Sequence, residues 1–259
     1  MDDKEPDLAS AEPLQRWLTS LERRHLTDLT FSEVARALRA LSSCYVERRT
    51  KLASGGALDS GGKRAAFALF YAPLHFLVTR EVVRRPPDAC GSDLLELLDL
   101  GCGTGVAGAA WALQNNTARI TGIDRHPWAV AEARWTYSEL RLPGRALVGD
   151  ATRAKLPART SAAVVAAYTV NELQDAGRAE LLPRVLHAHS RGARVLIVEP
   201  IARSLGVWWD GWQDAFEAAG GEAREWRFDI PLPDLQVRLG HAAGLDVREL
   251  TARTLWLPR

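Results

Sequence analysis

The stretch Leu97-Leu98-Asp99-Leu100-Gly101-Cys102-Gly103-Thr104-Gly105 decides the fold class of this 259-residue chain. It begins with apolar residues typical of a buried strand, contains an acidic residue near the strand end, and runs directly into a glycine-rich turn. Helix-favouring residues follow, from Ala107 to Leu113. Glycines let a backbone approach a ligand closely, and a helix N-terminus attracts anionic groups. A strand, a tight glycine turn and a helix N-terminus together predict a nucleotide-cofactor site.

Alternating strand and helix patterns continue from this stretch to the end of the sequence. The expected strands lie at 94–100, 118–123, 145–149, 162–169, 193–198, 225–230 and 246–256, and the expected helices at 104–115, 127–140, 173–189, 206–219 and 232–243. Continuous apolar runs such as Ala162–Ala167 suit strands that are covered on both faces. The alternation predicts an α/β fold with a doubly wound, mostly parallel, seven-stranded sheet.

The residues that precede the sheet indicate helices. Apolar residues recur at helical spacing over Leu14–Leu26, and Thr30 with Glu33 forms a capping-box pattern at the start of a second helix. Ala65–Val83 is a third, very apolar helix, which Pro73 is expected to kink. Glycine and serine favour a flexible loop before this helix, over 53–62. The predicted organisation is a disordered tail over 1–12, a helical cap over 13–87 and a Rossmann-like domain over 88–259.

Composition and charge exclude several classes of protein. Hydrophobic residues make up 47% and charged residues 25%, and the net charge of +1 lacks the basic bias of a dedicated nucleic-acid binder. We find no apolar run approaching the roughly 18 residues that cross a membrane, and the acidic start Met1–Asp7 does not resemble a signal peptide. Three distant cysteines without a CxxC pair favour a reducing, cytoplasmic setting and no metal site.

The glycine turn is compatible with two classes of cofactor, a dinucleotide and S-adenosylmethionine. Gly103-x-Gly105-x-x-Gly108 formally matches a dinucleotide-binding pattern, and Asp124 follows at a suitable distance. Asp99 favours S-adenosylmethionine instead, because a carboxylate is awkward beside a pyrophosphate but suits ammonium and sulfonium groups. The pattern also begins behind a helical segment, whereas a dinucleotide fold usually begins near the N-terminus.

Over roughly residues 93–256, the sequence resembles a class I S-adenosylmethionine-dependent methyltransferase. Besides the opening stretch, the resemblance rests on Thr121–Asp124 and Val148–Ala151, at the ends of the second and third strands. It implies that Asp99 and the turn contact the amino-acid part of the cofactor, the turn residues being Gly101, Cys102, Gly103, Thr104 and Gly105.

The same resemblance assigns residues to the rest of the cofactor. It implies that Asp124 holds the two ribose hydroxyls, a task suited to a carboxylate acceptor. It implies that Asp150, followed by Ala151, accepts a hydrogen bond from the adenine amino group, while Arg125 or His126 covers the adenine face. Tyr168, which follows the fourth strand, completes the predicted cofactor-binding set.

The predicted acceptor-facing residues follow the fourth and fifth strands. Tyr168, Asn171 and Glu172 lie beside the expected topological switch point, and Glu199 ends the fifth strand. We name these four as catalytic candidates. Glu172 is open to two interpretations, a general base or a carboxylate that favours a helix N-terminus. Glu199 is likewise either a crevice residue or a loop and cap residue.

Two aromatic features have alternative interpretations. The cluster Trp208–Trp212 predicts either a wall for a flat or cationic acceptor, or the packing of a helix on the sheet. His75, in the apolar third helix, fits a buried core or interface histidine better than a base.

A finer resemblance concerns the acceptor side. Tyr168–Leu173, Leu181–Leu186 and Val195–Pro200 are similar to the methyltransferase family associated with the mitochondrial small ribosomal subunit and its bacterial relatives. This resemblance implies a ribosome or RNA partner. The sequence departs from the family in lacking both the cysteine ligands that some members use for an iron–sulfur cluster and a basic extension for RNA.

Three functions follow, with a dinucleotide enzyme as a more distant alternative. The first is methyl transfer to an O or N nucleophile of a small molecule or peptide, with the helical segment over the substrate. The second is a ribosomal RNA or ribosome-associated methyltransferase, and the third a non-catalytic cofactor-binding assembly factor. We expect S-adenosylmethionine as cofactor, a small-molecule acceptor in preference to RNA or ribosome, and neither a metal nor a membrane partner.

Overall fold

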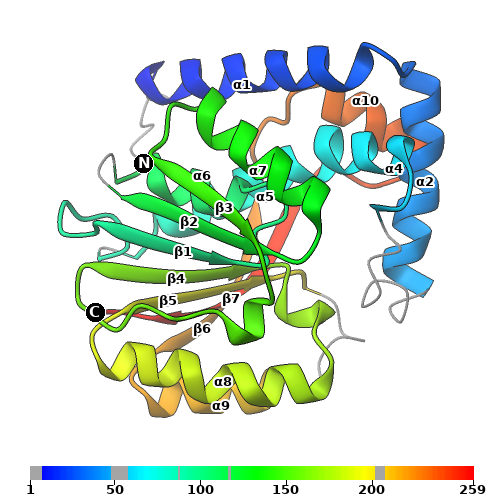
Figure 1. Ribbon diagram of the computed structural model, residues 1–259. Helices are drawn as coiled ribbons and strands as arrows, with labels where there is room; N and C mark the ends of the chain where they lie inside the picture. Colours follow the sequence, from blue (N-terminus) through cyan, green and yellow to red (C-terminus); the bar gives the residue numbers. More distant parts are fainter. Residues whose placement is uncertain (1–7, 48–57, 87, 116–117, 202–207) are drawn as a thin grey trace.

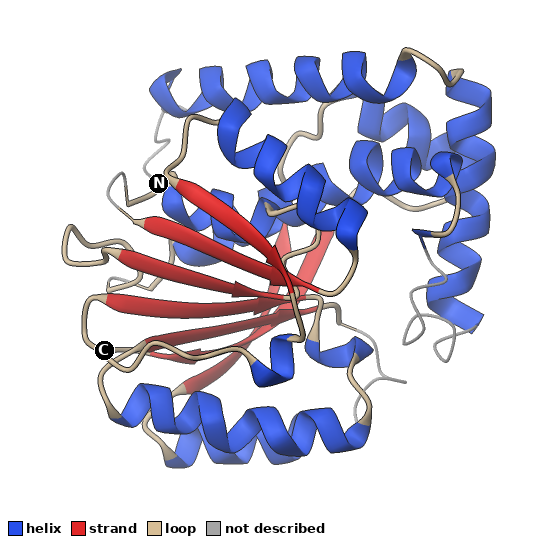
Figure 2. Cartoon of the chain, in the orientation of Figure 1, coloured by secondary structure: helices blue, strands red, loops and turns tan. Residues whose placement is uncertain are grey.

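Seven strands form one mixed sheet in the order β3-β2-β1-β4-β5-β7-β6 (Figures 1 and 2). The computed structural model describes residues 8–47, 58–86, 88–115, 118–201 and 208–259. The strands are β1 (Glu96–Leu100), β2 (Arg119–Asp124), β3 (Gly144–Val148), β4 (Ala162–Ala167), β5 (Arg194–Glu199), β6 (Glu222–Phe228) and β7 (Leu250–Leu257). The sheet confirms the predicted α/β architecture.

The strand directions define where a ligand can bind. Strands β1 to β5 pair in parallel, whereas β7 is antiparallel to both β5 and β6. From β1 the chain proceeds outward to β2 and β3, then returns to β4 on the other side of β1. The carboxyl ends of β1 and β4 therefore flank the switch point, where open α/β sheets form their binding crevice.

Helices cover both faces of the sheet (Figure 1). On one face lie α8 (Asp175–Ser190) and α9 (Trp209–Ala218), and on the other lie α5 (Ala72–Val83), α6 (Val106–Ala112) and α7 (Pro127–Glu139). Successive residues of β1 point to opposite faces, so that Leu97 joins one hydrophobic core and Leu98 the other. This double burial explains the apolar runs of the central strands β1, β4 and β5.

The N-terminal helices share a hydrophobic core with the sheet. They are α1 (Leu8–Leu26), α2 (Phe31–Glu47), α4 (Gly61–Ala66) and the π-helix η2 (Phe67–Tyr71), followed by α5; α2 also packs on α10 (Asp234–Ala243). Trp17 of α1 and Leu38 of α2 belong to the same core as Trp111 and Tyr137 of the sheet-covering helices. The helical segment and the sheet are thus joined by continuous apolar packing.

The ends of these helices test two local predictions. The predicted capping box is present: the Thr30 N–H donates to Glu33 Oε2 at 2.8 Å, and the Glu33 N–H donates to Thr30 Oγ1 at 3.3 Å. The disordered tail predicted over 1–12 extends too far, because α1 already begins at Leu8. The stretch from there is rich in the helix-favouring residues Ala9, Ala11 and Glu12. Residues 1–7 of that tail, and 53–57 of the predicted loop, lie outside the described residues.

Pro73 produces a π-helical turn rather than a simple kink. In η2 the Ala72 N–H donates to the Phe67 carbonyl, one residue further back than in an α-helix. Proline has no N–H to bond the Leu69 carbonyl, four residues before it. That carbonyl instead accepts a hydrogen bond from Nε2 of the buried Gln236 at 2.7 Å. The π-helical turn therefore accommodates Pro73, and Gln236 of α10 supplies the hydrogen bond that the Leu69 carbonyl lacks within the helix.

The same helix corrects an expectation about membranes. Among the described helices, Gly61–Val83 is long and apolar enough to cross a membrane by length and composition, although most of it is buried inside the protein. An apolar core helix passes this test without any membrane, and the burial agrees with that interpretation. The sequence already identified Ala65–Val83 as a very apolar helix, but its uncharged part, between Arg64 and Arg80, is shorter than a membrane span.

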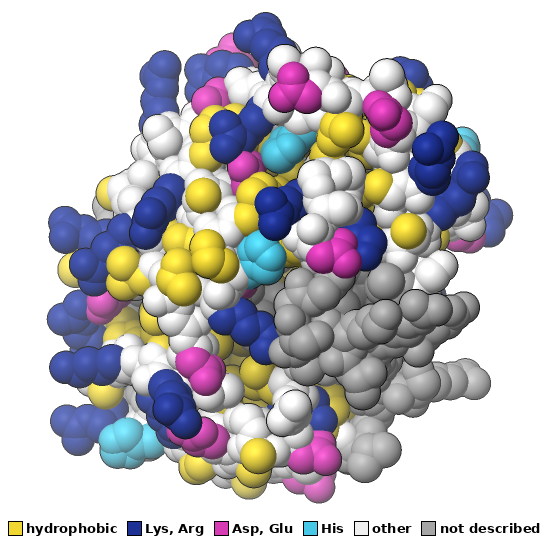
Figure 3. All heavy atoms as spheres, turned by 45° about the vertical axis from the view of Figure 1, so that its right-hand side comes forward, with side chains coloured by type: hydrophobic (Ala, Val, Ile, Leu, Met, Phe, Trp, Pro, Cys, Tyr) yellow, Lys and Arg dark blue, Asp and Glu magenta, His cyan; other side chains and the backbone are white. Residues whose placement is uncertain are grey.

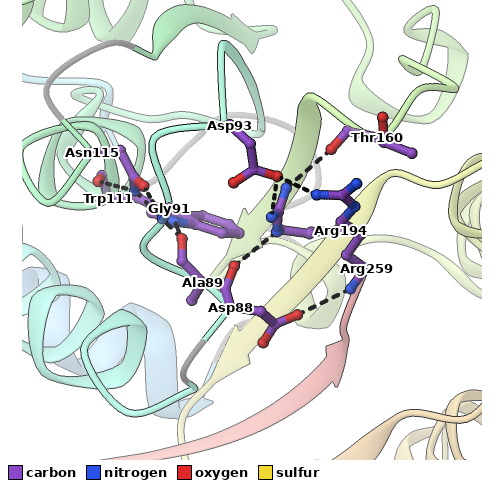
Figure 4. A network of polar contacts seen from close by, with 9 residues as sticks. All are labelled: Asp88, Ala89, Gly91, Asp93, Trp111, Asn115, Thr160, Arg194 and Arg259. Atoms are coloured by element: carbon purple, nitrogen blue, oxygen red, sulfur yellow. Dashed lines mark hydrogen bonds and ion pairs between the residues drawn. The ribbon is translucent and has the colours of Figure 1, made fainter.

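A polar network ties the segment before β1 to the end of the sheet opposite the crevice (Figure 4). Arg194, the first residue of β5, is only 2% exposed. Its guanidinium donates to the carbonyls of Asp88 at 2.8 Å and Thr160 at 3.1 Å, and to the Asp93 carboxylate at 2.8 Å. Arg259 contacts both Asp88 and Asp93. One buried cation thus holds together three segments distant in sequence.

Candidate functional site

A cavity of about 670 Å³ opens at the carboxyl ends of the parallel strands. Nearly all the predicted site residues line it: Asp99, Gly101, Cys102, Gly103, Thr104, Asp124, Arg125, His126, Asp150, Ala151, Tyr168, Asn171, Glu172 and Glu199. Gly105 is the exception. It precedes α6 with a φ of +80°, and a Cβ there would lie 2.7 Å from the Tyr137 ring, so this glycine is required by packing rather than by the cavity.

The glycine turn needs glycine for steric reasons. Gly101 and Gly103 have φ values of +63° and +51°, a region that side chains disfavour. A Cβ on Gly101 would lie 2.4 Å from both Cγ2 and Oγ1 of Thr169. The Thr169 hydroxyl is itself within 3.1 Å of the Leu100 and Ala167 carbonyl oxygens. Thr169, which follows β4, therefore packs directly against the glycine turn that follows β1.

Asp99 is a buried carboxyl beside this turn. It is 1% exposed, and its Oδ2 accepts a hydrogen bond from the Gly108 N–H at 2.9 Å. Burial raises the pKa of Asp99 to about 7, partly opposed by that hydrogen bond. A Cβ on Gly108 would lie 2.9 Å from the same oxygen, so this glycine makes room for the carboxyl. A cationic ligand in the cavity would favour the ionised form of Asp99.

Asp124 and Asp150 occupy the ends of β2 and β3. Asp124 accepts the Gly103 N–H on Oδ2 at 2.9 Å and the His126 N–H on Oδ1 at 2.8 Å. Asp150 accepts the Thr152 N–H and hydroxyl on one oxygen, at 2.9 and 2.8 Å, and these bonds lower its pKa. Both carboxylates thus organise local turns and, with about four acceptor positions each, keep capacity for a ligand.

Thr104 adds an unsatisfied polar group to the cavity wall. Its hydroxyl is buried and has no hydrogen-bond partner among the described residues. Buried polar groups are normally paired, so an orphaned hydroxyl in a cavity wall is suited to a ligand.

Glu199 and Asn171 form a hydrogen-bonded unit at the acceptor side. Glu199 is fully buried; its Oε1 accepts the Asn171 N–H at 3.1 Å and its Oε2 accepts Asn171 Nδ2 at 2.6 Å. The Asn171 side-chain oxygen accepts the indole N–H of Trp208 at 2.9 Å, which fixes the amide orientation. Burial raises the pKa of Glu199 to about 8. This carboxyl orders the turn after β4.

Glu172 lies in the same turn and lines the cavity. Burial raises its pKa to about 7, with Arg125 opposing the shift and Asp124 adding to it. No hydrogen bond to its carboxyl is found among the described residues. A carboxyl that titrates near neutral pH and faces a cavity is suited to accept a proton.

Three aromatic side chains of the N-terminal helices also line the cavity, which the sequence did not predict. Phe67, Tyr71 and His75 are four residues apart and share one side of the helix that runs through η2 and α5. His75 stacks on Tyr168 with ring centroids 3.6 Å apart. The four-residue spacing of these aromatic residues could have indicated a shared helix face. From the sequence, however, His75 was interpreted only as a core or interface residue.

The Trp208–Trp212 cluster packs on the sheet instead of lining the cavity. Trp209 and Trp212 are buried with Phe216 in the core between α9 and the sheet. The structure therefore has the packing alternative, and the Trp208 indole N–H donates to Asn171 at the edge of the site. No cluster of three metal-binding side chains occurs among the residues that the structure describes.

Comparisons with known proteins agree with this geometry. Residues 97–192 match a family model described as a methyltransferase domain. Over 55 residues, 21% of the chain, the sequence is 47% identical to Ribosomal RNA small subunit methyltransferase C of Actinobacillus succinogenes and 44% identical to that of Mannheimia succiniciproducens. The chain spans only 16% of the length of these curated relatives.

A solved structure resembles the whole fold. Mitomycin 7-O-methyltransferase MmcR aligns over 98% of this chain and 76% of its own, with a TM-score of 0.54 and 12% sequence identity. At this identity the likeness concerns the fold alone. Because nearly all of the chain is covered, that likeness includes the N-terminal helices.

Proposed function

We propose that this chain, which carries a class I S-adenosylmethionine-dependent methyltransferase domain, transfers a methyl group to an oxygen or nitrogen nucleophile of a small molecule or peptide. The observation that carries the choice of acceptor is the wall of aromatic side chains that the N-terminal helices bring to the cavity. Pockets lined by aromatic side chains with few polar groups suit small ligands.

The lining residues suit S-adenosylmethionine. When bound, it supplies a methyl group on a sulfonium, and transfer breaks the carbon–sulfur bond, leaving its electron pair on sulfur, as the acceptor's lone pair bonds to carbon. We assign Asp99 and the glycine turn to the charged amino-acid part, Asp124 to the ribose hydroxyls and Asp150 to the adenine amino group. The orphaned Thr104 hydroxyl and the spare acceptor capacity of the Asp124 and Asp150 carboxylates support this assignment.

Replacing Asp124 with alanine is expected to weaken binding of S-adenosylhomocysteine by about 1–3 kcal/mol, the usual cost of losing charge-assisted hydrogen bonds. Isothermal titration calorimetry measures this change. Asp214→Ala, which removes an exposed carboxylate from α9, is the matched control and should bind as the wild type does. Unchanged affinity in Asp124→Ala would remove the ribose role.

The methyl-transfer rate is expected to rise with pH through about 7. Glu172 accepts the acceptor's proton only when ionised, and its pKa of about 7 sets the midpoint of kcat/KM. Glu172→Gln should lower the rate by about 10²–10⁴-fold and remove this midpoint. Radiolabelled methyl transfer between pH 5.5 and 8.5 is the measurement, with exposed Glu180→Gln as control. A fully active Glu172→Gln enzyme would leave Glu172 as a structural residue.

A ribosomal RNA acceptor is the second candidate function. The 55-residue match to an rRNA methyltransferase favours it. RNA binding depends mainly on phosphate contacts, so it calls for a continuous basic surface. On the face drawn in Figure 3, Lys and Arg side chains lie among acidic and hydrophobic ones over the middle, and several gather along the left edge. Methylation of purified small-subunit rRNA, without methylation of any small molecule, would favour this alternative.

A third candidate function is that of a non-catalytic assembly factor. A non-catalytic assembly factor would bind S-adenosylhomocysteine but transfer no methyl group to any acceptor, which single-turnover assays distinguish from an enzyme.

We assign the protein to the cytoplasm, where the free thiols of Cys90 and Cys102 would remain reduced.

A further inference from the structure

We infer that the methyl acceptor is a flat, uncharged aromatic molecule bearing a hydroxyl group, which packs on the rings of Phe67, Tyr71, His75 and Tyr168. We call these four residues the aromatic wall. This inference rests on the proposed methyl transfer and specifies its substrate class.

The aromatic wall is a continuous surface built from two parts of the chain. The centroid of Phe67 lies 6.0 Å from that of Tyr71 and 6.2 Å from that of His75, and Tyr71 and His75 are 6.0 Å apart. His75 continues the surface onto Tyr168, with the two rings only 12° from parallel. All four residues line the cavity. A flat ring can therefore stack on or meet the edge of several aromatic neighbours at once.

The aromatic wall adjoins the cofactor-binding turn. A Cβ on Gly103 would lie 3.9 Å from the tip of the Phe67 ring. The opposite end of the wall, Tyr168, immediately follows β4, next to the predicted acceptor residues. A molecule on this surface thus lies between the glycine turn and the Asn171–Glu172 turn, where an acceptor must be.

Tyr168 is held against His75 at a conformational cost. It has a φ of +56°, which is uncommon for a residue other than glycine, and its N–H donates to the Val198 carbonyl at 2.7 Å. Such strained residues persist where the surrounding structure fixes them, and they cluster at functional sites. In this conformation the Tyr168 ring stacks on His75 and lines the cavity.

The charges around the aromatic wall select against ionic acceptors. Burial lowers the pKa of His75 to about 3, so its ring is neutral at physiological pH. Burial also raises the pKa of the Tyr168 hydroxyl and of Glu199, which favours their uncharged forms. An anionic acceptor would meet Glu172 and Asp124 as well as the nearby guanidinium of Arg125, which already interacts with Glu172. A protonated amine has no lone pair with which to take up a methyl group.

The polar groups near the aromatic wall suit a hydroxyl. Among the described residues, no hydrogen bond to the His75 ring is found, and a neutral imidazole offers one donor and one acceptor. A phenolic hydroxyl has a pKa of about 10, so it is protonated at neutral pH, and forming the methyl ether releases this proton to a base. No hydrogen bond to the Glu172 carboxyl is found among the described residues, and this carboxyl lines the cavity, so it is suited to take that proton. His75 orients the hydroxyl, and Glu172 deprotonates it.

The first test compares two-ring ligands of similar size that differ in aromaticity or in charge. Calorimetry on the full chain saturated with S-adenosylhomocysteine measures binding of 1-naphthol, its saturated analogue decahydro-1-naphthol, and naphthalene-1-sulfonate. We expect 1-naphthol to bind at least tenfold more tightly than either of the others. Equal affinity for the saturated alcohol, or tighter binding of the sulfonate, overturns the inference.

The second test removes one ring. Tyr71→Leu should weaken 1-naphthol binding at least tenfold while leaving the affinity for S-adenosylhomocysteine within about threefold, and Tyr71→Phe should restore most of the loss. Phe31→Leu, which removes a ring from α2 outside the cavity lining, is the matched control and should change neither affinity. Wild-type affinity of Tyr71→Leu for 1-naphthol contradicts the aromatic wall as the acceptor site.

Labelled methyl transfer separates the failure of this inference from that of the proposed function. Transfer to 1-naphthol in the presence of labelled S-adenosylmethionine supports both. Transfer to an aliphatic alcohol, an amine, a peptide or rRNA, with none to aromatic hydroxyls, overturns the acceptor class but keeps methyl transfer. Absence of both S-adenosylhomocysteine binding and transfer to any of these acceptors overturns the proposed function itself.

Discussion

Gly101→Ala is expected to lose at least 100-fold in affinity for S-adenosylhomocysteine, about 2.7 kcal/mol. The new Cβ would lie 2.4 Å from two atoms of Thr169, a side chain that the Leu100 and Ala167 carbonyls hold in place. The φ of +63° adds roughly 1–2 kcal/mol of strain for any L-residue. Because neither problem can be relieved without moving the turn, the backbone that we propose to contact the cofactor is displaced.

Calorimetry with S-adenosylhomocysteine measures the loss, and circular dichroism checks that the variant is folded. Gly211→Ala is the matched control, because a Cβ there meets nothing within 4 Å in α9. It should bind as the wild type does and gain about 0.5–1 kcal/mol of stability from the helix preference for alanine. Wild-type affinity in Gly101→Ala would mean that the turn is not the cofactor site.

Arg194→Ala is expected to destabilise the protein by about 3 kcal/mol without altering the affinity of the remaining folded molecules for S-adenosylhomocysteine. The buried guanidinium satisfies two carbonyls and one carboxylate, and its removal leaves these acceptors without their donor (Figure 4). The network lies at the amino ends of the parallel strands, away from the cavity. Arg194→Ala should therefore lose stability while its folded molecules keep their affinity for S-adenosylhomocysteine.

Urea unfolding followed by fluorescence measures this change in the free energy of unfolding. Arg159→Ala is the control, because Arg159 pairs with Glu96 on the surface, with its side chain 63% exposed. Surface ion pairs contribute about 0–1 kcal/mol, so this variant should stay close to the wild type. Equal midpoints for the two variants would show that the buried network contributes no more than a surface pair.

The sequence predicted the features that are encoded locally. The glycine turn, the acidic residues Asp99, Asp124 and Asp150, and the helix start at Thr30 are patterns of neighbouring residues, and the structure contains each at its expected place in the fold. The alternation of strands and helices fixed the sheet because buried parallel strands have a recognisable apolar composition. Strand ends were less accurate, as for β6, expected at 225–230 and found at Glu222–Phe228.

The features that the sequence did not predict depend on contacts between distant segments. The π-turn before Pro73 requires Gln236 of α10 to satisfy a freed carbonyl. The position of His75 in the cavity requires Tyr168, and the buried Arg194 requires Asp88 and Thr160. None of these partners is near in sequence, so periodicity and spacing alone could not reveal them.

The core shared by the N-terminal helices and the sheet constrains how the protein can move. Trp17 and Leu38 are buried in the same apolar cluster as Trp111 and Tyr137, and the buried Glu132 of α7 binds Arg24 of α1 at 2.8 Å. Swinging these helices away as a rigid lid would expose the apolar cluster to water, which is unfavourable in proportion to the apolar area exposed. The N-terminal helices are therefore expected to stay packed on the sheet when a ligand enters the cavity.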